Sequence, residues 1–585
     1  MNYPYSGLQL MELLEKQHQT RLQAEFFKTG TFTLQWRTKV GSFPHPDVET
    51  LVSAGEPCGA WKLSQGNGRP EEKRNVGDNW EVFRELPLYG YIPGASIRGI
   101  VRLWAKQRPE IAARMLYLLG NQDEQGITAG KVEFLDAWPE TPTKLSLDIV
   151  NPQQNFQVYH EGQSTPLSLY TLGDGAESTA VKVAIRGIPG QVSAAEVEEV
   201  WQWVQHALSR YGIGSRTASG YGAVKPPKGF KAQLDLRRFN PNDSTKQFEF
   251  SLYSQGSAGP DMGTMELRAS HWRGWLRSWV LRFLLGVMSK KDAEITLGEL
   301  LGTLQSPQDN LSRKGCVRLQ MIQGDLWEEF SNQYPRFYGW KGQVALTAPK
   351  DILNSIILPI VKFAVSVGGV GRGWRRPLHV FHMNNGNAAA RGTYLSLTHK
   401  VKVRDSDELK TRSYSLSVKP ADWSKQYDDW RTAVKAQWSD RVAPGYNNPL
   451  AEVFSPQTCA VYVLPGPSQE PADWKDMEWI EKKAVNTRGD GMEMVYRTLQ
   501  GNPPRNYKRN RDLGGSAGNG GAYCSWVSVK RINVPNQAEG TECQEVVCLF
   551  MGGQTSQANH VRSQFLKDLS TTPGQTHLFG VVPNP

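Results

Sequence analysis

The feature that most constrains the fold of this 585-residue chain is an order of four motifs that occurs twice. In the first half the motifs are YIPGASIRGIVRLWAK (91–106), LYLLG (116–120), GKVEFLDA (130–137) and GIGSRTASGYGAV (212–224). In the second half they are MELRASHWRGWLRSWVLRF (265–283), LGELLG (297–302), KGCVRLQMI (314–322) and GGVGRGWRRPLHVF (368–381). A chain of this length exceeds one hydrophobic core, so the repetition predicts two similar units.

Each unit reads as a strand, a helix, two strands, a second helix and a last strand that follows the glycine-rich motif. The helix assignments rest on periodicity, because Ile97, Val101 and Trp104 fall on one helical face. Second helices are expected at 195–211 and at about 351–367. This βαββαβ order is that of ferredoxin-like folds. The sequence therefore predicts an α+β protein with two tandem ferredoxin-like (RRM-like) modules.

The expected domains are a first module (1–230), a second, divergent module (231–395) and an insertion or extension (396–585). A linker rich in Pro, Asn and charge (226–247) places the first boundary near Phe230. The last part contains a basic, glycine-rich segment (505–522), which we interpret as a mobile arm. It also contains strand candidates at 458–466, 525–534 and 545–553 and a helix candidate at 559–569. These elements form either an ordered insertion or a degenerate third unit.

Charge and composition favour a polyanionic partner. Lys and Arg number 67 and Asp and Glu 57, a net charge of +10. The six cysteines form no CxxC pair, so no metal site is predicted. No apolar run has the length of a membrane span and the N-terminus has no signal-peptide pattern, so we expect a cytoplasmic location.

The start of the first helix is a candidate phosphate contact. Ser96 follows a Pro-Gly turn and is expected to be the N-cap of a basic helix, whose first N–H groups attract anions. Arg98, Arg102 and Lys106 follow at four-residue spacing on one helical face. The corresponding residues of the second unit are Ser270, Arg273 and Arg277. The alternative is ordinary capping beside a solvated basic face.

The glycine-rich motifs are the second candidate contact. In loop 1 (212–222) four glycines surround Arg216, which allows close approach to a ligand. The loop lacks the GK[ST] of a P-loop and follows a helix, unlike a Rossmann turn. Loop 2 (368–376) adds Arg372, Trp374, Arg375 and Arg376. Interleaved arginines and aromatic rings can hold a single-stranded backbone and stack on bases.

YIPGASIRG followed by GIGSRTASGYG resembles the RAMP superfamily of CRISPR-associated proteins. The stretch from LYLLG to LDIVNP is also similar to backbone subunits of type III effector complexes. The resemblance covers residues 30–225 well and 248–383 more loosely, where ELRASHWRG lacks the Pro-Gly turn and carries an extra residue before Arg273. It implies a guide-RNA (crRNA)-binding subunit whose partners are crRNA, complementary target RNA and other subunits of the complex.

The resemblance also implies a cleavage site. Some such subunits cut target RNA with an Asp in the loop ahead of the YIPG segment, and Asp78 occupies that place. It would assist attack of a ribose 2′-hydroxyl on the next phosphodiester, with Mg²⁺ as a plausible, weakly held cofactor. Asp47 is the second candidate, and a simple turn at 77–79 is the alternative for Asp78.

Two other functions stay open. One is a stand-alone RAMP endoribonuclease that processes CRISPR repeat RNA, and the other is an RNA-binding assembly subunit without catalysis. Metal-independent chemistry would need histidines, and the candidates are His271, His379 and His382.

Overall fold

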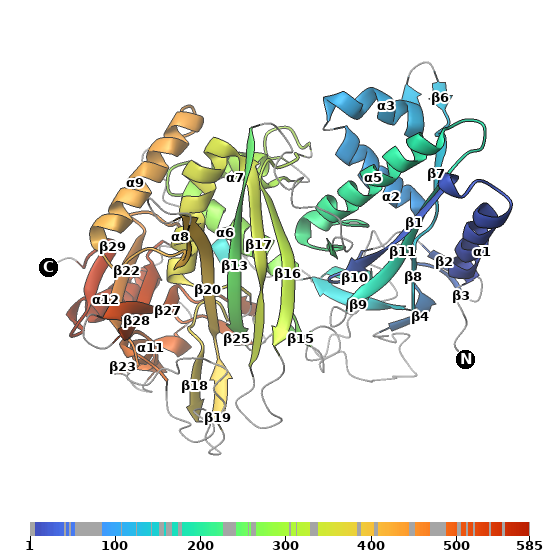
Figure 1. Cartoon of the computed structure of the whole chain (residues 1–585). Helices are drawn as coiled ribbons and strands as arrows, with labels where there is room; N and C mark the ends of the chain where they lie inside the picture. Colours follow the sequence, from blue (N-terminus) through green and yellow to red (C-terminus); the bar gives the residue numbers. More distant parts are fainter. Residues whose placement is uncertain are drawn as a thin grey trace.

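The computed structural model shows a mixed helix and strand protein (Figure 1). It describes residues 6–39, 43–45, 48–52, 85–106, 108–123, 126–141, 143–150, 157–159, 167–173, 178–225, 242–254, 257–258, 265–303, 306–311, 313–327, 337–371, 373–382, 388–402, 408–443, 451–467, 487–499, 505–510, 513–518, 521–536, 540–552 and 556–583. Asp47, Asp78, Phe230 and Arg372 lie outside these residues, so the boundary predicted near Phe230 stays a prediction.

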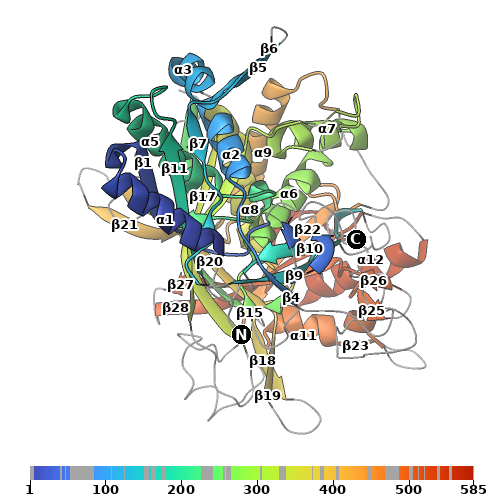
Figure 2. The same ribbon diagram turned by 90° about the vertical axis from the view of Figure 1, so that its right-hand side faces the viewer.

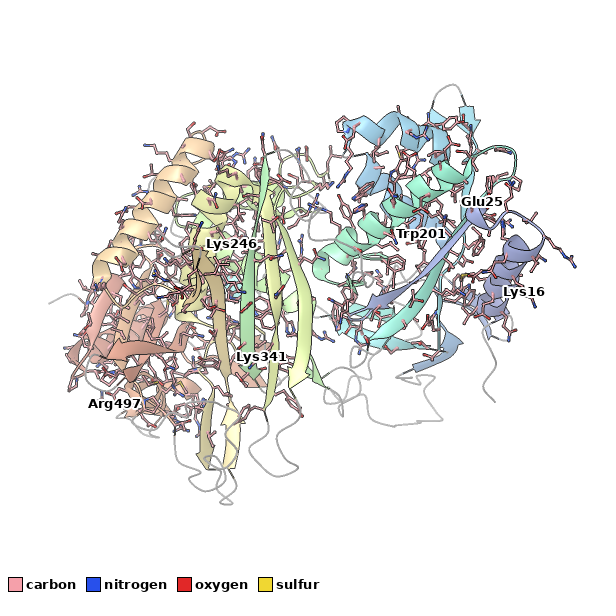
Figure 3. The ribbon with its side chains drawn as sticks, viewed as in Figure 1. Lys16, Glu25, Trp201, Lys246, Lys341 and Arg497 are labelled. Carbon is pink, nitrogen blue, oxygen red and sulfur yellow. The ribbon has the colours of Figure 1, made fainter. Side chains whose placement is uncertain are left out.

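The first unit is an antiparallel sheet with helices packed on it. Its strands, in spatial order, are β12 (Val224–Lys225), β1 (Phe27–Leu34), β11 (Thr179–Gly187) and β7 (Val132–Phe134), with β8 (Trp138–Pro139) also on β11. The helices are α1 (Ser6–Thr20), α2 (Gly94–Ala105), α3 (Pro109–Leu119) and α5 (Ala194–Tyr211). Trp201 of α5 lies against β1, where a Cβ on Gly30 would be 3.0 Å from its ring (Figure 3). A separate sheet of β10 (Leu167–Leu172), β9 (Lys144–Val150) and β4 (Glu85–Tyr89) adjoins this unit.

The second unit repeats the strand order of the first. Its sheet runs β16 (Arg318–Trp327), β17 (Tyr338–Pro349), β13 (Asp243–Ser254), β20 (Thr393–Lys402) and β21 (Leu409–Ser413). The helices are α6 (Ala269–Leu284), α7 (Lys290–Leu301), the π-helical turn η4 (Ile352–Ile357) and α8 (Leu358–Val367). If the four principal strands of each unit are numbered along the chain, both sheets have the order 4-1-3-2.

The closing strand of the second unit differs from the expectation. The segment after loop 2 was expected to supply it, but β18 (His379–His382) instead pairs with β19 (Ala388–Arg391) as a hairpin. The strand beside β13 is β20, which crosses residue 395, where we had placed the end of the second module. Figure 2 shows this hairpin and the hairpin of β5 (Asn121–Asp123) and β6 (Gly126–Thr128) at opposite ends of the molecule.

The last part of the chain contains a third sheet with the same order. Its strands run β27 (Val527–Asn536), β28 (Gly540–Phe550), β22 (Cys459–Pro465) and β29 (Thr576–Gly580). The helices of this part are α9 (Pro420–Gln437), α11 (Asp490–Tyr496) and α12 (Ser556–Thr571). The three predicted strands and the helix are confirmed.

Smaller pairs of strands complete the secondary structure. They are β2 (Phe43–His45) with β3 (Val48–Val52), β14 (Ser257–Ala258) with β15 (Met265–Glu266), β23 (Thr498–Leu499) with β24 (Arg505–Asn506), and β25 (Ser516–Gly518) with β26 (Gly521–Tyr523). Short 3-10 turns lie at Ala24–Phe26, Thr217–Ser219 and Tyr507–Arg509. Among the described helices we found none with both the length and the apolar character of a membrane span.

The second and third units share one hydrophobic core. Phe283 of α6, Phe363 of α8 and Phe579 of β29 belong to a single buried cluster, in which the ring of Phe363 makes tilted contacts with the other two rings. The first unit has its own core between its sheet and helices α2, α3 and α5. Trp36 and Tyr221 of the first unit pack into the core of the second, so the first two units are joined by buried contacts.

Candidate nucleic-acid interface

A carboxylate from another segment caps the start of α2. The helix begins at Gly94 after Pro93, so the expected N-cap role of Ser96 is wrong. The backbone N–H of Gly94 donates to Asp136 Oδ1 at 2.8 Å. A Cβ on Gly94 would lie 2.2 Å from the carbonyl oxygen of Phe134, so this position requires glycine. The carboxylate already satisfies one of the exposed helix N–H groups that a phosphate would otherwise use.

The cations that follow divide into exposed and internal groups. Arg98 and Lys106 are exposed. Arg102 instead donates to the carbonyl oxygens of Leu119, at 3.2 Å, and Gly120, at the end of α3. Because unpaired carbonyl groups end every helix, this guanidinium acts as a C-terminal cap.

The second unit repeats this capping. Arg277 Nη1 donates to the carbonyl oxygen of Gly302 at 2.7 Å, and Arg273 donates to that of Leu301. Burial is the main cause that lowers the pKa of Arg273, to about 10. We therefore leave Arg102, Arg273 and Arg277 out of the proposed RNA contact, since each has an internal partner.

The register of the second unit is the same as that of the first. Helix α6 begins at Ala269, four residues before Arg273, as α2 begins four residues before Arg98. The extra residue expected before Arg273 is therefore not an insertion. Ser270 is the second helical residue, with Arg268 as N-cap, and His271 takes the place of Ser96.

Loop 1 has one exposed cation, Arg216, and lies beside the buried Lys39. Arg216 is exposed and has a left-handed backbone, with φ of 55°. The carbonyl oxygen of Lys39 accepts a hydrogen bond from Ser215 N at 2.9 Å, which brings the β1 extension to the loop. Burial, and then the charge of Arg216, lower the pKa of Lys39 to about 8.

The other end of loop 1 packs on the second unit. A Cβ on Gly220, whose φ is +91°, would lie 2.3 Å from the Cβ of Ala269 at the start of α6. Tyr221 donates its hydroxyl to Asp148 Oδ2 at 2.5 Å, and Arg268 donates to Asp148 Oδ1 at 2.5 Å. Asp148 is fully buried, so this cluster fixes the junction of the two units.

His271 lies beside this junction. A Cβ on Gly371 of loop 2 would be 3.2 Å from its Nδ1, so both glycine loops approach the start of α6. Burial, and then the charge of Arg268, lower the pKa of His271 to about 4. The imidazole is therefore neutral at pH 7 and is not a cationic phosphate ligand.

Loop 2 is largely internal, contrary to the expectation of an accessible stacking surface. Trp374 is 8% exposed and meets Trp279 edge-on, with ring centres 6.0 Å apart. Arg375 donates to both oxygens of Glu452, which also accepts from Arg282. Arg376 donates to the carbonyl oxygen of Val527 at 2.6 Å. These loop 2 side chains join the second unit to the third.

The structure also describes the other two candidate histidines and part of the basic segment at 505–522. His379 is 1% exposed and bonds the carbonyl oxygen of Pro377 through Nδ1 at 2.8 Å, and burial lowers its pKa to about 3. His382 is the last residue of β18, where it pairs with Ala388. In the basic arm, Tyr507 is fully buried and donates to Asp568 at 2.9 Å, so that part is anchored.

The described residues contain no group of three or more His, Cys, Asp or Glu side chains that could hold a metal ion. Asp78 and Asp47 are not among them, so the predicted cleavage site stays a prediction. What the described part of the interface offers is a set of exposed cations at α2 and loop 1.

In the comparison with known proteins, the matched segment contains α2 and loop 1. Residues 66–225 match the family model of the RAMP superfamily. Among solved structures, the crystal structure of Cmr6 from Pyrococcus furiosus matches at 18% identity, covering 34% of this chain and 96% of that chain with a TM-score of 0.19. That superposition carries no argument here. No curated protein matches the chain.

Proposed function

We propose, from the RAMP superfamily domain at residues 66–225, that this chain is a guide-RNA-binding backbone subunit of a type III CRISPR effector complex. The observation that carries the proposal is that the matched segment contains both the start of α2 and loop 1. The start of α2 exposes Arg98 and loop 1 exposes Arg216, while Lys106 is the exposed C-cap at the other end of α2.

The strand orders support a chain of several related modules. The 4-1-3-2 order, with the sequence βαββαβ, is that of a ferredoxin-like fold. We propose that the first two sheets are tandem RAMP modules and that the third is a degenerate one. Successive modules in one chain would contact successive stretches of one guide RNA.

The proposed contact acts through side-chain charge. Asp136 accepts a hydrogen bond from the first N–H group of α2, so phosphates would be held by the side-chain charges of the exposed residues Arg98, Lys106 and Arg216. Such contacts are independent of sequence and release counterions. The bases of the guide then stay available to pair with complementary target RNA.

The test is the salt dependence of guide-RNA affinity. Arg98→Gln, Lys106→Gln and Arg216→Gln together should reduce the slope of log affinity against log salt by about 0.7 for each lost contact. A matched control changes Lys410, Arg412 and Lys435 to Gln, three exposed cations of the second and third units. Equal slopes for the wild type and the first variant would refute the contact.

Cleavage of target RNA by Asp78 is a further part of the proposal. In the reconstituted guide complex with Mg²⁺, Asp78→Ala should abolish one discrete product of a labelled complementary RNA at unchanged guide occupancy. An unchanged product ladder would leave a binding subunit or move the chemistry to Asp47. Cutting of repeat RNA without a target would favour the processing endoribonuclease instead.

A further inference from the structure

The basic segment at 505–510 forms a fixed turn on the third unit. Its central residue, Tyr507, is fully buried and donates its hydroxyl to Asp568 of α12 at 2.9 Å. The segment that follows packs closely on the turn, because a Cβ on Gly514 would lie 2.2 Å from the carbonyl oxygen of Lys508. The turn is therefore held in one conformation by a buried side chain on one side and by glycine backbone on the other.

A two-stranded ladder brings a further cation to this turn. Strands β23 and β24 pair Thr498 with Asn506, so Arg497, just before β23, lies beside Tyr507, just after β24. Both residues contact the same carboxylate, since Asp568 Oδ2 accepts from Tyr507 and lies 3.5 Å from Arg497 Nη1. Figure 3 shows Arg497 on the side of the molecule that is away from the first unit.

The half-buried ring of Tyr496 places two more cations next to each other. The Lys508 ammonium lies 4.8 Å from the centre of this ring, and the Arg488 guanidinium lies 4.0 Å from it. Such cation–π contacts orient a charged group without neutralising it. Arg509, the next residue of the turn, is exposed. We call Arg488, Arg497, Lys508 and Arg509 the turn cluster.

Two members of the turn cluster have no carboxylate partner. Arg488 pairs with Glu493 at 3.6 Å, and Arg497 has the carboxylate already described. Lys508 and Arg509 form no ion pair with a carboxylate among the residues that the structure describes. Their charges are therefore available to an external anion.

The surroundings of the turn cluster favour a polyanion over a protein partner. The large exposed apolar side chains of the described residues all come from other segments, and none from the described part of 487–518. The core of a protein–protein interface is rich in aromatic side chains and depleted of charged ones. A nucleic-acid backbone is bound mainly by positive charge, which is what this surface presents.

We propose that the turn cluster binds the phosphate backbone of RNA through Lys508 and Arg509. This inference rests on the proposed function and adds a contact on the third unit, separate from α2 and loop 1. The turn is fixed before RNA arrives, so less conformational freedom is lost on binding than with a flexible basic arm.

The test compares two pairs of cations in the last part of the chain. Lys508→Gln with Arg509→Gln changes the turn, and Arg431→Gln with Lys435→Gln removes the same charge from exposed positions of α9. The probe is labelled guide RNA, and the readout is the slope of log affinity against log salt. The turn variant should reduce the slope by about 1.4, from two contacts at about 0.7 each, and the α9 variant should leave it unchanged.

Two further variants separate charge from folding. Lys508→Arg with Arg509→Lys keeps both charges and should keep the wild-type slope. Arg509→Gln alone changes an exposed side chain, so it should keep the wild-type melting temperature and still reduce the slope by about 0.7. Wild-type slopes in both glutamine variants, or an equal loss of slope in the charge-keeping variant, would overturn the contact.

The same turn changes in the Arg98→Gln, Lys106→Gln, Arg216→Gln variant distinguish this contact from that of the first unit. Separate contacts should give additive losses of slope. A loss from the first-unit changes alone would overturn the turn contact and leave the proposed function standing. Failure of the wild type to bind guide RNA would overturn both. Loss of polyglutamate binding in the turn variant, with an unchanged RNA slope, would overturn the choice of RNA.

Discussion

Glu452→Gln should strongly destabilise the junction between the second and third units. Glu452 is fully buried and accepts hydrogen bonds from two guanidinium groups, Arg282 Nε at 2.9 Å and Arg375 Nη2 at 2.9 Å. Glu452 forms ion pairs with both Arg282 and Arg375, and the neutral amide of the variant removes this shared negative charge. Two buried cations would then lack a counterion.

The expected cost follows from this geometry. Removing one partner of a buried ion pair typically costs about 3–5 kcal/mol. Carbonyl oxygens remain for both arginines, including Gln157 O at 3.2 Å from Arg282 and 3.4 Å from Arg375. We therefore take the lower end, about 3 kcal/mol, which corresponds to a roughly 100-fold change in the equilibrium for opening.

Hydrogen exchange measures this opening at two reporter amides. Phe454 N donates to Arg282 O at 3.0 Å, and Val529 N donates to Arg375 O at 2.9 Å. Their exchange should accelerate about 100-fold in Glu452→Gln when reclosing is faster than exchange, because the exchange rate then follows the opening equilibrium. As a control, Arg282→Met, Glu452→Gln and Arg375→Met together remove the charges and should recover most of the protection. Acceleration below about fivefold in the single variant would show that the charge of Glu452 does not hold these two arginines in place.

Three other changes have defined outcomes. Lys530 is buried, and burial lowers its pKa to about 7. The unfolded chain therefore binds more protons than the folded chain between pH 7 and 10.5, so stability rises with pH over that window. In Lys530→Met the midpoint of urea unfolding should no longer rise with pH; the same pH profile in the variant and the wild type would contradict this prediction. Arg277→Gln loses the cap at Gly302 and should cost about 1.5–3 kcal/mol, against less than about 0.5 for the exposed Arg98→Gln, measured by chemical denaturation. Gly220→Val combines a φ of +91° with a clash at Ala269, so hydrogen exchange at the start of α6 should increase; unchanged exchange would show that loop 1 does not hold this junction.

The element order was predictable because it rests on local pattern. Both repeats place a glycine after the helix that ends LLG, and Gly120 and Gly302 have φ values of 83° and 81°. The helices at 194–211 and 352–367, and three of the four strands of the third sheet, lie where the local pattern placed them, whereas β29 was not predicted. Local rules suffice where the hydrophobic period and the stop signal agree.

The roles of the arginines were not predictable, because their partners are distant in sequence. Arg375 finds Glu452 77 residues away, and Arg268 finds Asp148 120 residues away. An arginine in a glycine loop has the same local pattern whether it faces RNA or a buried carboxylate. The closing strand was misplaced for a similar reason, since the β18–β19 hairpin separates loop 2 from β20.

The most direct test of the central claim is ultraviolet crosslinking of the purified chain to the RNA it binds in cells, with sequencing of the RNA and mass spectrometry of the crosslinked peptides. We expect repeat-derived guide RNA, crosslinked to peptides from the start of α2 and from loop 1 around Arg216. RNA without repeat-derived sequence, or crosslinks confined to peptides elsewhere in the chain, would contradict it.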